Sequence, residues 1–445
     1  APSLAKRRAN LLKLKNALLA RRAEYQAAID ADFGHRPAHE TAIMELMPTA
    51  QGIDYLRKNL RRWMRPRSRR VSMTFQPASA KVVYQPLGVI GILSPWNYPI
   101  GLCLMPLATA IAAGNRAMVK PSEFTPKTSA LTTTMLSEIF SEEEVAIVIG
   151  GSEIGAAFSA LPFDHLVFTG STDVGRAVMK AASQNLVPVT LELGGKSPVI
   201  VERGFSLSRA AKSIVYGKLS NAGQTCVAPD YALVHENDID AFVAAYQGAV
   251  RASYPNGASD EAYGAIISQR HYERLARLVE DAGSKGARII EIGERAAARR
   301  VHTMVPTVIV GATLDMAVMQ EEIFGPILPI ISYKGFDEAI AYVNARPRPL
   351  ALYIFSDHNN TVGQILARTT SGNVTVNDTL LHYVQDDLPF GGVGPSGMGA
   401  YHGEEGFKSL SHAKGVFTQA KWNFSGLMRP PFGRIADLVL AYMLR

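Results

Sequence analysis

The chain has 445 residues, of which 47% are hydrophobic and 19% charged, a composition typical of globular proteins with room for two or three domains. The net charge of +7 is moderate, and two cysteines are too few for a disulfide framework, so they suit a reducing compartment. No apolar run reaches the roughly 20 residues that span a bilayer, and the charged N-terminus does not resemble a signal peptide. We therefore expect a cytoplasmic protein without a membrane span.

Basic residues cluster between residues 57 and 70, where eight of fourteen positions are Lys or Arg. Such clusters occur in surfaces that bind nucleic acid or membranes, and also in solvated helix ends and linkers. Trp63 is the one aromatic residue in the cluster, and no RNA- or DNA-binding signature accompanies it. We therefore favour a solvated helix end and linker, and expect no nucleic-acid partner.

The N-terminal region is predicted to be helical. Residues 3–33 have the apolar spacing of one long amphipathic helix, and residues 42–63 predict a second helix. Residues 71–84 have strand character around a polar turn at residues 77–79, with basic, proline-containing linkers on both sides. This segment is expected to be a ribbon that extends from the main body.

From residue 86 onward, short apolar runs alternate with helical patterns. The predicted strands are residues 89–93, 117–119, 145–149, 165–168 and 188–193. The predicted helices are residues 100–113 and 126–139, a helix that starts at residue 152, and residues 173–183. This alternation predicts a doubly wound, mainly parallel sheet.

The alternation resumes after residue 196 and predicts a second α/β domain. Its expected strands are residues 198–201, 231–234, 308–310, 328–331, 352–354 and 372–376. Helical patterns cover residues 207–219, 238–251, 269–282, 336–345 and 361–369. The final apolar run, residues 435–444, is too short to span a bilayer and predicts a packed or interfacial helix.

One cysteine, Cys226, lies in a stretch suited to a tight turn. The helical pattern of residues 207–219 runs into Asn-Ala-Gly at residues 221–223, and Pro229 opposes a restart of the helix. A thiol on such a turn is open to a flat electrophile, and nearby backbone N–H groups can stabilise an oxyanion. The alternative is a buried structural cysteine, which is the commoner state of a lone Cys and the one that we expect for Cys103.

Two polar side chains elsewhere in the sequence complement a nucleophilic thiol. Glu192 ends an apolar strand before two glycines, where desolvation raises the pKa of a carboxyl group and suits it to general-base catalysis. The alternative is a buried ion pair between Glu192 and Lys196. Asn97 follows the strand at residues 89–93, and its amide can donate a hydrogen bond to an oxyanion; the alternative is an ordinary turn asparagine.

Three segments are candidates for nucleotide binding. The only G-x-G-x-x-G, residues 392–397, lacks the preceding strand and following helix of a dinucleotide site, so we interpret it as a glycine-rich loop near a site. Gly170 and Ser171 have the right context, because a strand passes through them into a helix whose N-terminus can bind phosphate; a simple turn fits equally well. Lys120 and Glu123 follow another strand and can bind ribose hydroxyls, although alone they also fit a solvated turn.

Taken together, these motifs resemble those of the aldehyde dehydrogenase superfamily, over essentially the whole chain. The matching segments are residues 95–99 (PWNYP), 120–123 (KPSE), 168–171 (FTGS), 191–196 (LELGGK), 223–226 (GQTC), 321–326 (EEIFGP) and 389–394 (PFGGVG). The short N-terminal region, Asn377-Asp378 and residues 397–403 are similar to the compact class 3 branch, and in particular to bacterial coniferyl-aldehyde dehydrogenases.

The resemblance implies an α/β fold with a Rossmann-like cofactor domain, a second α/β catalytic domain and a small β oligomerisation arm. It also implies that the cofactor domain lacks the usual glycine fingerprint. The expected boundaries are residues 1–66 and 87–195 for the NAD(P)-binding domain, 196–408 for the catalytic domain, 67–86 and 409–430 for the arm, and 431–445 for the tail. A homodimer is expected by the same resemblance.

Roles follow for the residues at matching positions. Cys226 corresponds to the nucleophile, Glu192 to the general base, and Asn97 to the amide that stabilises the oxyanion together with the backbone N–H of Cys226. The implied cofactor contacts are Lys120 and Glu123 at the adenine ribose, Trp96 and Ser171 near the pyrophosphate with Gly170 at the turn, Glu322 at the nicotinamide ribose and Phe324 beside it. No metal is expected.

The implied reaction is oxidation of an aldehyde to a carboxylic acid through a thiohemiacetal and a thioester on Cys226. NAD is the expected cofactor, because Glu123 opposes a 2′-phosphate. The resemblance to class 3 implies that NADP is also accepted. Glu192 argues against transfer of the acyl group to coenzyme A, and the intact set of candidate residues argues against a non-catalytic scaffold.

The expected small-molecule substrate is an aryl or hydroxycinnamyl aldehyde, such as coniferaldehyde, on the resemblance alone. A medium-chain aliphatic aldehyde is the alternative. Tyr98, Tyr383 and Phe390 are candidates to line an aromatic-accepting pocket, and each of them also fits ordinary core packing.

Overall fold

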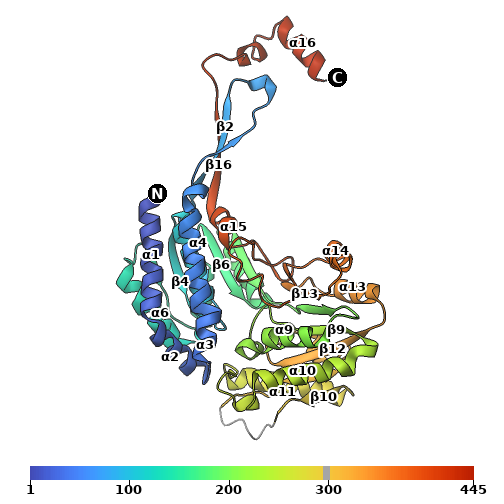
Figure 1. Cartoon of the computed structure of the whole chain (residues 1–445). Helices are drawn as coiled ribbons and strands as arrows, with labels where there is room; N and C mark the ends of the chain where they lie inside the picture. The colour runs from blue at the N-terminus through green and yellow to red at the C-terminus, as the bar shows by residue number, and fades with distance from the viewer. Residues whose placement is uncertain (294–300, 445) are drawn as a thin grey trace.

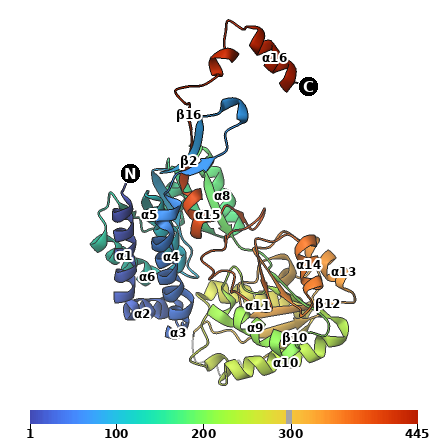
Figure 2. The same ribbon diagram turned by 45° about the horizontal axis from the view of Figure 1, so that its top comes forward.

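The computed structural model describes residues 1–293 and 301–444, which form two mainly parallel sheets with helices around them and a small antiparallel arm (Figure 1). The predicted α/β class is therefore confirmed. The two large sheets lie in separate halves of the body, and the arm projects beyond them in both views (Figure 2).

The six-stranded sheet has the order β15-β7-β6-β3-β4-β5. Its strands are β3 (Val89–Leu93), β4 (Arg116–Lys120), β5 (Val145–Ile147), β6 (His165–Gly170), β7 (Val189–Leu193) and β15 (Gly397–Met398), and its helices include α5 (Gly101–Ala113), α6 (Pro126–Ile139), α7 (Ser152–Ser159) and α8 (Thr172–Ser183). The strand order reverses between β3 and β6. In doubly wound sheets, ligands bind outside the carboxyl ends of the strands at such a reversal.

The seven-stranded sheet has the order β10-β11-β12-β9-β8-β13-β14. Its strands are β8 (Pro198–Val201), β9 (Tyr231–His235), β10 (Arg288–Glu291), β11 (Thr307–Val310), β12 (Ile327–Tyr333), β13 (Ala351–Phe355) and β14 (Asn373–Val376). Helices α9 (Leu207–Leu219), α10 (Ile239–Ser253), α11 (Gln269–Ser284), α12 (Ala317–Gln320), α13 (Phe336–Asn344) and α14 (Asn359–Arg368) accompany it. Only the antiparallel edge strand β10 was not predicted, and its side chains are only partly buried or exposed.

The prediction of one helix over residues 3–33 is wrong, because the chain bends at Arg21 (φ −101°, ψ 21°) between α1 (Leu4–Ala20) and α2 (Arg22–Phe33). α1 packs against α4 and α5, whereas α2 packs against α6, where the Tyr25 hydroxyl lies 3.2 Å from the Thr132 hydroxyl. Because α1 and α2 pack against different helices, one straight helix could not bury the apolar faces of both segments.

The second predicted helix begins earlier and is interrupted. It comprises α3 (Ala38–Thr41), a π turn (Ala42–Leu46) and α4 (Met47–Trp63). The π turn contains Glu45, whose side chain is fully buried. Such turns within helices are frequent at functional sites.

The arm is a three-stranded sheet of β1 (Arg67–Arg69), β2 (Ser79–Pro86) and β16 (Ser411–Thr418). The predicted strand at residues 71–84 therefore starts later, because a 3₁₀ turn (Met73–Phe75) precedes it. β2 is the central strand, and β16 is one of the two outer strands and pairs with β2 along its whole length. In the basic cluster, Arg62 in the last turn of α4 and Arg67 in β1 form ion pairs with Glu404. These contacts agree with the interpretation of the cluster as a helix end and linker.

The C-terminal segment ends in α16 (Arg434–Met443) at the far end of the arm (Figure 1). Leu438 and Tyr442 are 70% and 80% exposed, so this predicted helix is present but is not packed on the body. Within the described residues, no helix combines the length and apolarity needed to cross a membrane.

The domain boundaries remain a prediction. β15 pairs with β7, and α15 (Gly403–Ser409) packs against α4 and α5, so both lie with the six-stranded sheet. These contacts indicate that the second domain ends before β15 rather than at residue 408.

Candidate active site

The turn that carries Cys226 adopts the left-handed backbone that its sequence allows. After α9, Asn221 and Ala222 have φ values of 51° and 50°. Gly223 follows with φ 78°, and a Cβ there would lie 2.4 Å from the carbonyl oxygen of Gly325, so only glycine fits. The predicted tight turn is confirmed, and its half-buried thiol is free.

Asn97 reaches this turn from the segment after β3. Its Nδ2 donates to the carbonyl oxygen of Gln224 at 3.1 Å, and Nδ2 of Asn221 donates to the Asn97 carbonyl oxygen at 2.9 Å. The hydroxyl of Tyr98 lies 2.6 Å from that of Thr225. Three hydrogen bonds thus join the two segments, and the Asn97 amide retains one N–H for another acceptor.

Glu192 is 3% exposed at the end of β7, and neither of its carboxylate oxygens has a hydrogen-bond partner among the described residues. Lys196, its predicted alternative partner, binds instead to Asp230 and to the carbonyl oxygens of Val318 and Glu321. The ion-pair interpretation is therefore wrong. Burial raises the pKa of Glu192 well above its ordinary value, which suits a group that accepts a proton.

The glycine-rich loop lies against Glu192. Gly397 pairs with Glu192 between β15 and β7, and a Cβ on Gly391 would lie 3.3 Å from the carboxylate. A short strand, β15, and not a helix, begins at the last glycine of the G-x-G-x-x-G. The interpretation of this segment as a loop near a site is confirmed.

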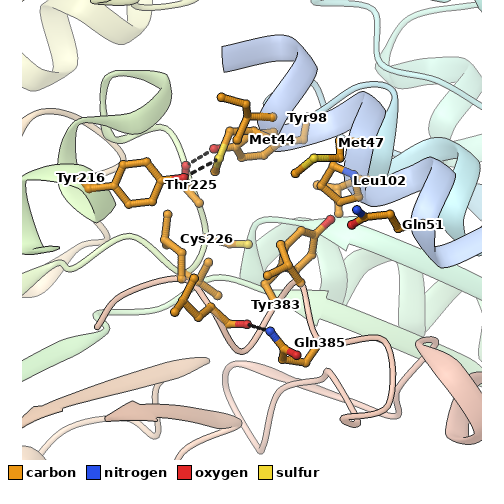
Figure 3. Close-up of a pocket in the computed structure, with 16 residues that line it drawn as sticks. Met44, Met47, Gln51, Tyr98, Leu102, Tyr216, Thr225, Cys226, Tyr383 and Gln385 are labelled. Atoms are coloured by element: carbon orange, nitrogen blue, oxygen red, sulfur yellow. Dashed lines mark hydrogen bonds between the residues drawn. The ribbon is translucent and has the colours of Figure 1, made fainter. Parts of the chain in front are cut away.

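Cys226 contributes to the walls of two cavities. The first is an apolar pocket of about 340 Å³, where the Cys226 side chain points into the space between Tyr98 and Tyr383 (Figure 3). Aliphatic side chains and methionines form most of its other walls, including Met44, Met47, Leu102 and Leu380. The third predicted aromatic residue, Phe390, is not among the lining residues but stacks in the core on His382 and His402.

The second cavity is a larger cleft of about 600 Å³. Asn97, Glu192 and Cys226 line it together. Five of the predicted cofactor residues also line it: Trp96, Gly170, Ser171, Glu322 and Phe324. The thiol is therefore accessible from the apolar pocket on one side and from this cleft on the other.

One part of the cleft fits a dinucleotide phosphate. Ser171 is the N-cap of α8, and its Oγ accepts a hydrogen bond from Val174 N. The first-turn N–H groups of this helix and the guanidinium groups of Arg176 and Arg348 supply positive charge to the cleft. The residues present therefore fit the pyrophosphate of NAD(P).

Another part of the cleft has an aromatic wall. The Trp96 ring centroid lies 5.5 Å from that of Phe324 and 5.2 Å from that of His271. Burial and the neighbouring Arg274 lower the pKa of His271, which favours a neutral ring. His271 was not predicted, because a histidine on an amphipathic helix such as α11 gives no sequence signal for a cleft.

Glu322 projects onto the glycine pair after Glu192. A Cβ on Gly194 would lie 2.0 Å from Oε2 of Glu322, so the carboxylate occupies space that any side chain would need. Burial and Asp230 raise the pKa of Glu322 to about 8. Its protonation state therefore responds to charge placed in the cleft.

Lys120 and Glu123 form an ion pair of 3.1 Å at the carboxyl end of β4. Neither residue is among those that line the cleft. The adjacent Phe124 contacts His271, with ring centroids 6.2 Å apart, so the segment borders the cleft. Lys120 is 4% exposed, which rules out the solvated-turn interpretation for that residue.

The two thiols differ in their surroundings. Burial and the carboxyl groups of Glu322 and Glu192 raise the pKa of Cys226, and backbone N–H groups oppose this effect only weakly. The free thiol is therefore neutral near pH 7 and needs a base or a bound cation for activation. Cys103 is fully buried in α5, as predicted for a structural cysteine, and burial raises its pKa to about 12.

Comparisons with known proteins agree with this arrangement. The aldehyde dehydrogenase family matches residues 1–416. A protein named probable coniferyl aldehyde dehydrogenase from Pseudomonas aeruginosa is 51% identical over 94% of this chain and 87% of its own length. The substrate-bound structure of Staphylococcus aureus AldH is 38% identical with a TM-score of 0.93, covering 99% of this chain and 95% of that one. A Mycobacterium tuberculosis aldehyde dehydrogenase complexed with NAD⁺ is 28% identical with a TM-score of 0.85, covering 95% and 86%.

The chain belongs to the aldehyde dehydrogenase family. It is an oxidoreductase that acts on aldehydes with NAD(P).

Proposed function

We propose that Cys226, Asn97 and Glu192 carry out the oxidation of an aldehyde to its carboxylic acid. The observation that supports this proposal most directly is that Cys226 lines both the apolar pocket and the cleft. An aldehyde that enters through the pocket meets the thiol, and the cleft provides space for the nicotinamide on its other side.

In the first step, the Cys226 sulfur attacks the carbonyl carbon, and the carbonyl oxygen becomes an oxyanion. The free N–H of the Asn97 amide and the backbone N–H of Cys226 donate to that oxyanion. The thiol proton is released to solvent, and the positive charge of a bound nicotinamide would stabilise the thiolate, so Glu192 stays unprotonated for the later hydrolysis. The product is a thiohemiacetal on Cys226.

When bound, NAD(P) would supply the hydride acceptor for the thiohemiacetal carbon, so that Cys226 would then carry a thioester. Trp96 and Phe324 provide aromatic surface for the cofactor, and Glu322 provides a carboxylate for its ribose hydroxyls. Ser171 and the N-terminus of α8 would hold the pyrophosphate.

Hydrolysis completes the cycle. Glu192 accepts a proton from a water molecule, which attacks the thioester carbon and forms the carboxylic acid as the Cys226 thiolate leaves. No other carboxylate is needed in this step. The raised pKa of Glu192 makes it a stronger base than an exposed glutamate.

The apolar pocket favours an aldehyde with a large apolar body. Tyr98 and Tyr383 provide ring surfaces for an aryl group, and the Pseudomonas aeruginosa relative's name supports coniferaldehyde as a substrate. An NADH-linked screen should give a higher kcat/KM for coniferaldehyde and benzaldehyde than for medium-chain aliphatic aldehydes. The reverse order would instead assign the aliphatic alternative.

NAD is the proposed cofactor, and NADP is accepted. Glu123 follows β4 in a segment that borders the cleft, and the charge of its carboxylate would oppose a 2′-phosphate. Its ion pair with Lys120 reduces that repulsion, which is why NADP is tolerated. A higher kcat/KM for NADP than for NAD would refute this order.

The proposed assembly is a cytoplasmic homodimer that forms through the arm. β16 is an outer strand, its Phe417 is 53% exposed, and Phe75, whose ring contacts that of Phe417, is 50% exposed. Exposed strand edges of this kind pair readily with a second chain. Light scattering should give twice the mass of one chain, and a monomer would contradict the proposal.

A further inference from the structure

A buried ion pair lies directly behind the Asn97 segment. The side chains of Arg36 and Glu45 are both fully buried, and Nη1 of Arg36 donates to Oε1 of Glu45 at 2.9 Å. Arg36 lies between α2 and α3, and Glu45 lies on the π turn. Two buried charges require compensating contacts, and both of these residues make theirs on the Asn97 segment.

Arg36 binds the backbone of Asn97. Its Nη1 also donates to the Asn97 carbonyl oxygen at 3.1 Å, and Asn221 donates to the same oxygen at 2.9 Å. Both acceptor positions of that carbonyl are therefore filled, one of them by a charged donor. One Nδ2 hydrogen of Asn97 is bound to the carbonyl oxygen of Gln224. The direction of the second Nδ2 hydrogen therefore depends on how the Asn97 backbone is held.

Glu45 holds the other end of the segment. Its Oε2 accepts hydrogen bonds from Ile100 N at 2.7 Å and from Gly101 N at 3.0 Å, at the start of α5. A carboxylate is favourable at a helix N-terminus, where N–H groups lack partners within the helix. The ion pair thus holds residues 97–101 at both ends.

The same guanidinium supports the wall of the apolar pocket. The Arg36 Cζ lies 4.8 Å from the centre of the Tyr98 ring, and the Tyr98 hydroxyl contacts Thr225, the neighbour of Cys226. A shift of Arg36 would therefore move the amide and the pocket wall relative to the thiol.

We propose that Arg36, held by Glu45, is a positioning residue that aims the free N–H of the Asn97 amide at the oxyanion formed on Cys226. This inference rests on the role of Asn97 in the proposed function. Arg36 itself is not among the residues that line the apolar pocket or the cleft. Its effect on the rate therefore passes through Asn97.

A double-mutant cycle on the full-length protein tests this coupling. Steady-state kinetics with coniferaldehyde and NAD would be measured for Arg36→Met, for Asn97→Ala and for the combined variant. We expect Arg36→Met to lower kcat at least tenfold with an unchanged KM for NAD, and to lower it less than twofold further in the Asn97→Ala background. Arg21→Met, which breaks a surface ion pair with Glu138, is the matched control and should keep full activity.

Arg36→Met leaves the Glu45 charge buried and can destabilise the fold, so Arg36→Met/Glu45→Met is the second variant. Replacement of a buried ion pair by apolar residues of similar volume is often neutral for stability. Thermal unfolding should stay near that of the wild-type protein while kcat falls at least tenfold. Arg36→Lys should recover part of the lost rate, because it retains the charge but not the planar geometry.

The outcomes separate the two proposals. If Asn97→Ala loses less than tenfold in kcat, the oxyanion role in the proposed function is wrong, and the role of Arg36 is wrong with it. If Asn97→Ala is severe but Arg36→Met lowers kcat by the same factor in both backgrounds, only the positioning role of Arg36 is overturned. Full activity in Arg36→Met would also overturn it.

Discussion

Nδ2 of Asn97 lies 3.1 Å from the carbonyl oxygen of Gln224, two residues before Cys226. Asn97 follows a strand of the six-stranded sheet, and Gln224 follows a helix beside the seven-stranded sheet. The hydrogen bond therefore joins the two halves of the body at the thiol. An oxyanion formed on Cys226 would be stabilised by groups from both halves.

Replacement of this amide should slow the reaction without changing the fold. Asn97→Ala removes one oxyanion donor, and we expect kcat to fall on the order of 10²–10³-fold. Steady-state kinetics would measure the loss, with Asn185→Ala, an exposed asparagine, as the control. A loss below tenfold would indicate that Asn97 only supports the turn.

The glycine after Leu193 should be essential for cofactor binding. In Gly194→Ala, the new Cβ would lie 2.0 Å from Oε2 of Glu322 and would displace that carboxylate. We expect the KM for NAD to rise at least tenfold. Gly363→Ala on α14 is the matched control, because a Cβ there meets nothing within 4 Å. Equal KM values for NAD in the two variants would argue against a cofactor role for Glu322.

Two buried histidines should make the protein sensitive to mild acid. Burial lowers the pKa of His382 and of His402 from 6.5 to about 4, so the folded state resists protonation that the unfolded state accepts. The stability that each provides is complete above pH 6.5 and is lost as the pH falls from 6.5 to about 4. The full shift corresponds to on the order of 3 kcal/mol per histidine.

Urea unfolding at pH 7 and pH 5 would measure this effect. His402→Phe keeps the ring stacking on Phe390 but cannot bind a proton, so its unfolding free energy should fall less between the two pH values than that of the wild-type protein. His39→Phe, at an exposed position, should behave like the wild-type protein. The same pH dependence in both variants would mean that His402 is not responsible.

Most of the strands and helices could be predicted, because strands buried between helices have short apolar runs and helices have apolar spacing. The break at Arg21 could not, since nothing in the local sequence distinguishes one long helix from two. The bend arises from contacts with partners far along the chain, such as that between Tyr25 and Thr132. The pairing of β15 with β7 is equally non-local.

The candidate site could be predicted as a set of residues but not as a geometry. Motif order pointed to Cys226, Glu192 and Asn97, and the structure brings all three to one cleft. Arg36 and His271 carry no local signal, because an arginine after a helix and a histidine on one are ordinary surface residues by pattern. Only the fold reveals that one is buried and that the other lines the cleft.

The most direct test of the account is a single-turnover experiment on Glu192→Gln. Without its general base, the enzyme should form about one equivalent of NADH per active site and then stop. Mass spectrometry of the stalled protein should find the acyl group on the peptide that contains Cys226. Continuous turnover at the wild-type rate, or an acyl group absent from that peptide, would contradict the central claim that Cys226 carries the thioester and Glu192 drives its hydrolysis.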